Sequence, residues 1–570
     1  MNSNLRRKII TGIVFFLFII IWLFWLWKQL IVGTFVAGDS FFHASRIYEI
    51  RYAFLHHELP NFLNFQSFFG MGQAVNGMYP DISLWPLVLV TLPLSFIKQI
   101  YAIRLIIIFL TFIITYCSLI GQKVSKTNSL LVSIIYVTSG YSLYQSVVEL
   151  QLGTAMIYCF SFPIFFCAKE IIESKDIDKL LVLKTALLLA LILYSHLLSV
   201  ISLVIVIFIV LLYKLCINGN SIKYSIINSA LAGIISFFFV LPIIFRYFVI
   251  SKSRISAPFS QGNITSESLL ELFQMPYGWA ARTTLPAVSF FLIFLVLFLG
   301  SNNGKSLNYL SIEALLMFLC TNLFPWAIFN KVPIINNLQF TPWRFGIWLG
   351  IIPLIVFLKT FDNQKLLWKL LIIFASISVF ASLQFINDFS SNNGQQNLTL
   401  RLYKNKQGRN RVAGDDLDRT ILTRDYTPRE ANIKGNENRV TNLTSSLAFD
   451  PYVFTKKTKA KVRKMPINNG IKITLEDPIE GKISLPIYGY RSINYEVKIN
   501  GKSIPYSVDK KGYLQLTPDL NLKKNEVIII ASKNPKVYVY LVFISLLLYT
   551  ICLVHLFRFK NKSGYYTLLR

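Results

Sequence analysis

The chain has 570 residues, of which 54% are hydrophobic and 15% are charged, and its mean hydropathy is +0.52. A water-soluble protein of this size carries more charge and shorter apolar runs, so this composition excludes an ordinary soluble fold. The formal net charge of +29 favours basic cytoplasmic loops and contact with anionic lipids over nucleic acid, because no nucleic-acid-binding motif accompanies it. All six cysteines lie inside apolar runs, which indicates buried small side chains without a disulfide framework.

The N-terminal segment carries Arg6, Arg7 and Lys8 before about 24 apolar residues, which predicts an uncleaved first transmembrane helix with a cytoplasmic N-terminus. Residues 36–80 follow as a polar outer loop that is punctuated by glycine and proline. The next apolar run, 81–97, contains two prolines. We expect it to form a partly inserted or re-entrant helix.

The apolar segments that follow are each long enough to cross a bilayer as a helix. They lie at 101–120, 128–147, 151–168, 180–197, 198–216, 226–249, 286–300, 309–329, 343–360, 366–386 and 537–557. Basic residues concentrate in alternate loops, and the positive-inside rule then places both termini in the cytoplasm. We expect a polytopic α-helical protein of the cell membrane with about 12 spans, and 13 or 14 as the alternative.

Residues 387–536 differ in composition from the rest and begin with a Gly-, Asn- and Gln-rich linker. Short strand-like runs follow, and Asn500-Gly501 between two of them predicts a hairpin. We expect a small extracytoplasmic β-sandwich-like domain between a membrane domain, 1–386, and the last helix, 537–557, with a cytoplasmic tail at 558–570. Its 27 basic against 15 acidic residues suit contact with an anionic polymer or with lipid headgroups, although a merely solvated surface is as common.

Three polar residues cluster where the chain leaves the first span. Asp39, His43 and Arg46 would share one face of a helix. Charges at a membrane boundary are costly unless they are solvated, paired with an opposite charge or needed for function. Asp39 is either part of a helix cap, in which Asp39 or Ser40 accepts a backbone N–H, or a general base that takes a proton from an acceptor hydroxyl. Arg46 is suited to binding a phosphate bidentately, and His43 to either role.

Other candidates lie on the same predicted side of the membrane. Arg344 follows Gln339 in a Gln-Phe-Thr-Pro-Trp-Arg-Phe segment, where it either anchors a helix at the interface or binds a lipid phosphate. His196 and Arg282 are further possible ligands of the substrate, and Tyr79 belongs to the outer loop. Glu149 and Gln151 lie near an outer helix end, and Glu149 is either a second acid or a solvated residue.

The sequence contains no recognisable metal site. His56, His57 and Glu58 are consecutive, but adjacent side chains point in different directions on a helix or a strand, so joint ligation is poor. We expect no metal and no cofactor, and leave dependence on a divalent metal open.

These features together resemble the bacterial YfhO-type membrane proteins, also catalogued as 6-pyruvoyl-tetrahydropterin-synthase-related membrane proteins. The resemblance rests on Asp39 after the first span, an outer-loop Gly-x-Gly with Tyr79-Pro80, the Trp343-Arg344 segment and a β-domain before one last span. Thr341 is an insertion relative to the family's segment, and Asp425-Tyr426-Thr427-Pro428 departs from its Glu-Tyr-Leu-Pro-type motif.

The resemblance implies a GT-C type glycosyltransferase that uses a polyprenyl-phosphate-linked sugar as donor, with Asp39 as catalytic base and inversion of configuration. The acceptor would be a cell-wall polymer such as teichoic acid, or another extracytoplasmic acceptor. Substrate-binding roles then fall to His43, Arg46, Tyr79, His196, Arg282, Gln339 and Arg344. The enzyme that makes the lipid-linked sugar is a possible partner, in addition to anionic lipids.

Two other functions fit the sequence. A transporter or flippase of lipid-linked sugars also needs internal charges and a lipid-accessible cavity. A non-catalytic envelope assembly protein would use the basic β-domain instead. Neither the sugar, the acceptor nor the oligomeric state follows from the sequence.

Overall fold

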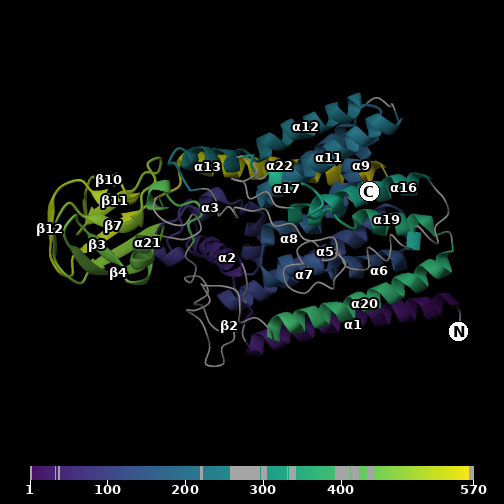
Figure 1. Ribbon diagram of the computed structural model, residues 1–570, viewed down its shortest axis with the longest axis horizontal. Coiled ribbons are helices and arrows are strands. Elements are labelled where there is room, and N and C mark those ends of the chain that lie inside the picture. The colour runs from purple at the N-terminus through teal and green to yellow at the C-terminus, as the bar shows by residue number, and fades with distance from the viewer. Residues whose placement is uncertain are drawn as a thin grey trace.

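The structure is a computed structural model that describes residues 3–32, 34–35, 39–218, 222–256, 295–296, 304–329, 331–332, 342–361, 363–391, 411–412, 423–432 and 441–563. A bundle of helices forms one end of the molecule and a β-domain the other (Figure 1). The helices are α1 (Ser3–Val32), α2 (Ser40–Leu55), α3 (Val75–Met78), α4 (Trp85–Val90), α5 (Phe96–Gly121), α6 (Lys126–Val137), α7 (Gly140–Leu143), α8 (Leu152–Cys159), α9 (Ser161–Ile172), α10 (Lys179–Ser195), α11 (Leu197–Asn218), α12 (Lys223–Phe239), α13 (Leu241–Ser251), α16 (Gly304–Cys320), α17 (Trp326–Phe329), α19 (Ile351–Thr360), α20 (Gln364–Ser391), α21 (Asn442–Phe449) and α22 (Lys536–Ser563).

Several of these helices are apolar enough to cross a membrane. Among the described residues, five are long enough on their own, and the number rises to eight if three bent helix pairs each count as one span. The expected count of about 12 spans stays a prediction. The run 81–97 contains a 3₁₀ turn, Ile82–Leu84, and the short helix α4, whose proline stands in its first turn. At about 1.5 Å per residue, six helical residues cannot cross a bilayer.

The three bent pairs interrupt spans that the sequence predicted as continuous. The helices α6 and α7 meet at 55°, α8 and α9 at 56°, and α12 and α13 at 68°. Pro163 and Pro242 stand near the starts of α9 and α13, where a proline cannot donate a backbone hydrogen bond to the preceding turn. At the first break, Ser139 caps α7 by accepting a hydrogen bond from the Ser142 backbone N–H.

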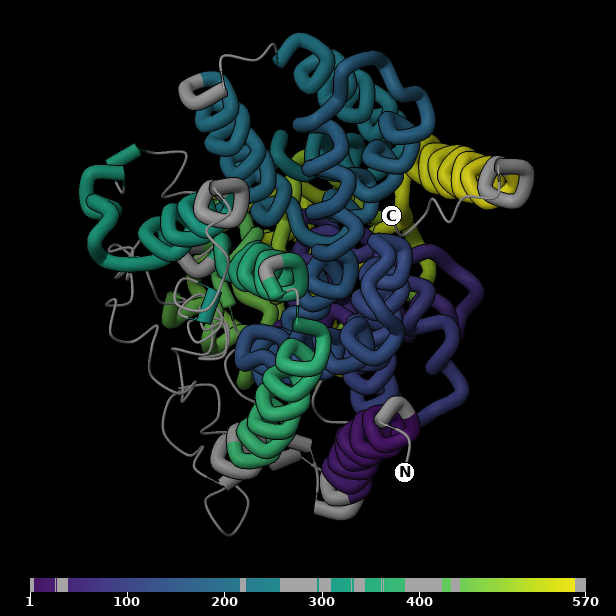
Figure 2. Tube along the Cα trace, turned by 90° about the vertical axis from the view of Figure 1, so that its right-hand side faces the viewer, coloured from purple at the N-terminus to yellow at the C-terminus, as the bar shows by residue number. Residues whose placement is uncertain are grey.

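The two ends of the bundle carry different contacts. At the end far from the β-domain, Arg7 of α1 lies over the ring of Trp368 in α20, and Lys214 of α11 donates to the carbonyl of Ile172. At the other end, Ser253 contacts Ser492 of the β-domain. Figure 2, which views the bundle from its far end, shows α1, α20 and α22 at its periphery. Which end faces the cytoplasm stays a prediction from charge.

The strands of the described residues belong mainly to the β-domain. They are β1 (Thr34–Phe35), β2 (Arg411–Val412), β3 (Tyr452–Phe454), β4 (Lys459–Ile467), β5 (Gly470–Leu475), β6 (Ile479–Gly481), β7 (Ser484–Tyr488), β8 (Glu496–Ile499), β9 (Lys502–Ser503), β10 (Tyr506–Val508), β11 (Tyr513–Leu516), β12 (Leu520–Leu522) and β13 (Val527–Ala531). Nine of them form one curled sheet in the order β10-β11-β7-β3-β4-β5-β13-β8-β9. The predicted hairpin is confirmed, because β8 pairs with β9 and both Asn500 and Gly501 have positive φ.

The long strand β4 joins the two halves of the curled sheet. Its first part, Lys459–Lys461, pairs with β3, whereas Val462–Ile467 pairs with β5. One strand therefore belongs to both halves of the sheet, which the structure shows as one curled sheet, while its description as a sandwich stays a prediction. Sequence reasoning missed β4, although the alternation of exposed basic and buried apolar residues at its start is the pattern of a half-buried strand.

The β-domain packs on the outer loop through a shared core. The largest cluster of buried hydrophobic side chains runs from the outer loop and α5 through α10 and α13 into the sheet and α22. The Gly70 and Gly72 backbones both have positive φ, and a Cβ at Gly70 would lie 2.6 Å from Cδ1 of Ile471. The Tyr488 N–H donates to the carbonyl of Met71 over 2.9 Å. The outer-loop Gly-x-Gly therefore allows the backbone to approach the sheet closely.

Lys464 lies in the contact between the β-domain and the outer loop, and we expect it to make the stability of the protein depend on pH. Burial lowers the pKa of Lys464, whose Nζ lies 3.4 Å from Sδ of Met71, from 10.5 to about 7. Between these two values the unfolded chain binds a proton that the folded chain does not, so stability falls as the pH decreases from about 10 to about 7 and is flat below. Lys464→Met should remove this slope and stabilise the protein at pH 7 by about 1–2 kcal/mol, since solvent partly screens the half-buried ammonium group.

The measurement is thermal unfolding of purified wild type and variant from pH 6.5 to 10. Lys461→Met, at an exposed position of the same strand, is the matched control and should leave the slope unchanged. Parallel pH profiles for wild type and Lys464→Met would contradict the prediction.

Candidate functional site at the junction of bundle and β-domain

Asp39 stands where the predicted cluster begins, directly before α2. It occupies the N-cap position, but its side chain makes no capping hydrogen bond. Its carboxylate is exposed and accepts a hydrogen bond from Nε2 of Gln151 over 3.2 Å. Asp39 is thus the N-cap through its backbone carbonyl, which accepts from the His43 N–H over 3.0 Å, while its carboxylate makes no cap and remains accessible for another role.

Gln151 joins Asp39 to a second carboxylate. Its Nε2 also donates to Oε2 of Glu149 over 2.9 Å, and the Tyr144 hydroxyl donates to Oε1 of Glu149 over 2.7 Å. Glu149 is buried, and residues Tyr144–Val148 before it form a single π-helical turn. Such turns are rare and occur frequently at functional sites. One amide thus bridges an exposed acid and a buried acid.

Two arginine–histidine pairs form the basic side of the cluster. Arg46 donates from Nη1 to Nδ1 of His43 over 3.2 Å, and Arg344 donates to Nε2 of His196 over 3.2 Å. A guanidinium only donates, so each imidazole accepts through an unprotonated nitrogen. His196 then donates from Nδ1 to the Ser199 hydroxyl over 2.8 Å. Burial, with Arg46 and Arg344 nearby, lowers the pKa of His43 well below its ordinary value, which agrees with a neutral imidazole at this position.

The ring of Tyr79 lies between these two pairs. The Arg46 guanidinium lies 4.0 Å from the centre of the ring, and the rings of His43 and His196 lie 5.6 and 5.8 Å from it. Burial raises the pKa of Tyr79, the charges of Arg46 and Arg344 lower it, and those of Asp39 and Glu149 raise it. Tyr79 is therefore within electrostatic reach of the acidic and the basic side alike.

A buried ion pair holds the backbone on which Tyr79 stands. Arg246 of α13 donates from Nη1 to Asp81 over 2.7 Å, and both side chains are at most 1% exposed. Arg246 also donates to the Tyr79 carbonyl over 3.3 Å, while Arg46 donates to the Pro80 carbonyl. Two arginines from distant parts of the sequence therefore fix the Tyr79–Asp81 segment. The three residues Arg46, Arg246 and Asp81 are called the arginine clamp.

The segment Asp425–Pro428 covers the cluster from the β-domain side. Tyr426 is half-buried and packs with Phe42, Phe68, Val75 and Tyr79. Its carbonyl accepts a hydrogen bond from the Tyr490 hydroxyl over 2.8 Å. The β-domain thus contributes directly to the surroundings of Tyr79.

The structure brings together most of the predicted site residues. Asp39, His43, Arg46, Tyr79, His196 and Arg344 belong to this one cluster, whereas Arg282 and Gln339 lie outside the described residues. Sequence reasoning missed Asp81 and Arg246. Arg246 carries the single charge inside the run 226–249, and a lone arginine in an apolar segment is a signal of function or pairing.

Metal ligation has no support in the described part of the chain, where no group of three or more His, Cys, Asp and Glu side chains is arranged to hold a metal ion. His56 and His57 lie at the other end of α2 from Asp39, both exposed. His56 contacts the carbonyl of Tyr52 through Nδ1 over 2.8 Å.

The arginine clamp predicts a large loss of stability when its carboxylate is removed. Asp81→Asn leaves the buried guanidinium of Arg246 without its paired carboxylate, which should cost about 3–5 kcal/mol. Asp450→Asn is the matched control, because Asp450 pairs with Lys461 at the surface with 72% of its side chain exposed. It should change stability by less than about 1 kcal/mol.

Thermal unfolding of the purified variants in detergent measures both effects. The pair Asp81→Leu with Arg246→Met should recover most of the loss, since it removes the buried charges together. Equal melting temperatures for Asp81→Asn and Asp450→Asn would contradict the role of the clamp.

The sequence was also compared with known proteins. No protein-family model matches it, and no curated protein matches it either. The resemblance to the YfhO-type proteins therefore rests on the short motifs quoted above, and what it implies stays an expectation.

Proposed function

We propose that this chain is a bacterial membrane glycosyltransferase of the GT-C type, which moves a sugar from a polyprenyl-phosphate donor to a hydroxyl of an extracytoplasmic envelope polymer. The observation that carries the proposal is the arrangement around Tyr79. An exposed carboxylate that caps no helix, Asp39, and a half-buried guanidinium, Arg344, are both within electrostatic reach of this ring. Glycosyl transfer from a phosphate needs both a base and a positive group.

The proposed step is a single displacement at the anomeric carbon. The acceptor oxygen forms a bond to that carbon while Asp39 takes the hydroxyl proton. The bond between the anomeric carbon and the phosphate oxygen breaks, and its electron pair leaves with the polyprenyl phosphate. Attack from the face opposite the leaving group inverts the configuration. Positive side chains stabilise the charge that develops on the phosphate.

The two arginines divide this work according to their burial. Arg46 is fully buried and is already engaged with His43, Tyr79 and the Pro80 carbonyl, so its role is to support the ring. Arg344 is only half-buried and is the arginine that contacts the donor phosphate. His196, which accepts from Arg344, orients that guanidinium.

The basic β-domain is consistent with a polyanionic acceptor. Lys459, Lys461 and Arg463 point to the same exposed face of β4, because alternate residues of a strand share one side. An acceptor such as teichoic acid would gain local concentration beside the site through this charge.

A flippase of lipid-linked sugars is the second candidate, and one observation favours it. Three spans are broken by bends of 55–68°, and discontinuous helices are typical of transporter sites. The charged cluster, however, lies at the β-domain end of the bundle, where transfer to an outside acceptor would occur. Movement of a lipid-linked sugar between leaflets without any transfer to an acceptor would favour the flippase.

The sharpest test is Asp39→Asn, which keeps the size of the side chain and removes its basicity. We expect the transfer rate to fall by roughly 10²–10⁴-fold, while expression, membrane insertion and melting temperature stay unchanged, since the Asp39 side chain caps no helix. The assay measures release of polyprenyl phosphate from a panel of polyprenyl-phosphate hexoses, with envelope polymer as acceptor.

Asp176→Asn is the control, because Asp176 is exposed at the opposite end of the bundle, beside α12. It should retain wild-type activity. Full activity of Asp39→Asn would rule out its role as the base, and the absence of transfer by wild type with every donor of the panel would rule out the proposed reaction.

A further inference from the structure

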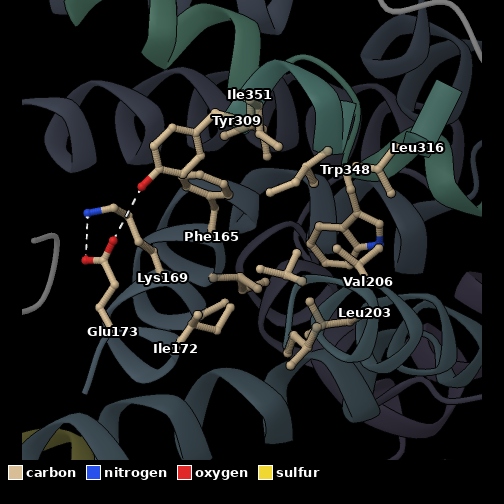
Figure 3. Close-up of a pocket in the computed structure, with 16 residues that line it drawn as sticks. Phe165, Lys169, Ile172, Glu173, Leu203, Val206, Tyr309, Leu316, Trp348 and Ile351 are labelled. Atoms are coloured by element: carbon tan, nitrogen blue, oxygen red, sulfur yellow. Dashed lines mark hydrogen bonds and ion pairs between the residues drawn. The ribbon is translucent and has the colours of Figure 1, made fainter. Parts of the chain in front are cut away.

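A pocket lies within the helical bundle, apart from the cluster around Tyr79. It is lined by 16 residues from α9, α11, α16, α19 and the turn before α19, and it holds about 770 Å³ including the space at its open mouth. Almost all of its lining is apolar, and Figure 3 shows Leu203, Val206, Leu316 and Trp348 gathered at one end. Along α11, its wall runs from Leu203 to Val210, which is about 10 Å of helix. Such a space suits a hydrocarbon chain and not a water-soluble metabolite.

The polar side chains of the pocket lie together at the opposite end. Lys169 pairs with Glu173 over 3.0 Å, and the Tyr309 hydroxyl donates to Glu173 over 3.4 Å (Figure 3). Lys359 of α19 is within electrostatic reach of both Lys169 and Glu173. Glu170 is also within electrostatic reach of Lys169 and pairs with Lys184, so three ammonium groups and two carboxylates leave this region with a net positive charge.

Trp348 stands at the inner end of the pocket, on the side of the candidate site. The Trp348 indole N–H donates to the Ser202 hydroxyl over 3.0 Å, and Ser202 donates to the Ser199 carbonyl. Ser199 is the residue that receives the hydrogen bond from His196. Trp348 at the inner end of the pocket is therefore linked through Ser202 and Ser199 to His196 of the cluster around Tyr79.

The rim lies at the bundle end far from the β-domain. Lys169 is in the last turn of α9, and the segment after it contacts α11 and α12 through Lys214 and Asn228. By the charge pattern this end is cytoplasmic, so the rim meets the headgroups of the inner leaflet, which is rich in anionic lipid.

We propose that this pocket is a binding site for an anionic phospholipid of the cytoplasmic leaflet, with one acyl chain between α9, α11 and α16 and its phosphate on Lys169 and Lys359. Lipid tails are as apolar as the lining, so burial of the chain gives little preference for one lipid over another. The preference comes from the positive rim, which favours a headgroup with net negative charge over a zwitterionic one.

The test uses the purified full-length protein in detergent, titrated with phosphatidylglycerol or phosphatidylcholine of identical chains, and native mass spectrometry counts bound lipid. We expect wild type to bind one phosphatidylglycerol about tenfold more tightly than phosphatidylcholine. Lys169→Gln and Lys359→Gln should each reduce that preference several-fold. Leu203→Trp, which fills the buried inner end, should weaken binding of both lipids.

Lys175→Gln is the matched control, since Lys175 is exposed on the loop after α9 and does not line the pocket. It should leave the preference unchanged. Equal affinity for the two lipids, or an unchanged preference in both rim variants, would overturn the proposal. So would displacement of phosphatidylglycerol by polyprenyl phosphate, which would assign the pocket to that lipid instead. The experiment measures lipid binding and not sugar transfer, so its outcome is independent of the proposed reaction.

Discussion

Two buried guanidinium groups hold the Tyr79–Asp81 segment, and the candidate site depends on this arginine clamp. Arg46 comes from α2 and Arg246 from α13, so the clamp joins the start of the outer loop to a helix far along the chain. A buried charge is costly unless it is paired and hydrogen-bonded. Here Asp81, two carbonyls and the Tyr79 ring satisfy the charges, and the same contacts fix the ring between the two histidines.

The β-domain completes this site in addition to covering it. The Tyr490 hydroxyl donates to the Tyr426 carbonyl and accepts from the backbone N–H of Ala74, so one side chain of the domain binds both segments beside Tyr79. The shared hydrophobic core makes the sheet, the outer loop and α22 one packed unit. An acceptor bound to the basic face of β4 would therefore be held on a scaffold that is rigidly connected to Asp39.

Much of this arrangement could be predicted from the sequence. The apolar lengths located most of the helices, and the Asn500-Gly501 turn located a hairpin, because both signals are local. The cluster of Asp39, His43 and Arg46 was found because charges at a membrane boundary are costly. The partners Asp81 and Arg246 were missed, since their pairing joins residues 165 positions apart, and a contact over that separation leaves no local pattern. The bends within spans were also missed, although Pro163 and Pro242 mark two of them.

The central claim is that the half-buried Arg344 receives the phosphate of a lipid-linked sugar beside Asp39. Binding of a non-hydrolysable polyprenyl phosphonate sugar to purified wild type and to Arg344→Gln tests it most directly. Loss of a charge-assisted contact to a phosphate predicts a Kd about 10- to 100-fold higher in Arg344→Gln. Equal Kd values for wild type and Arg344→Gln would contradict the account.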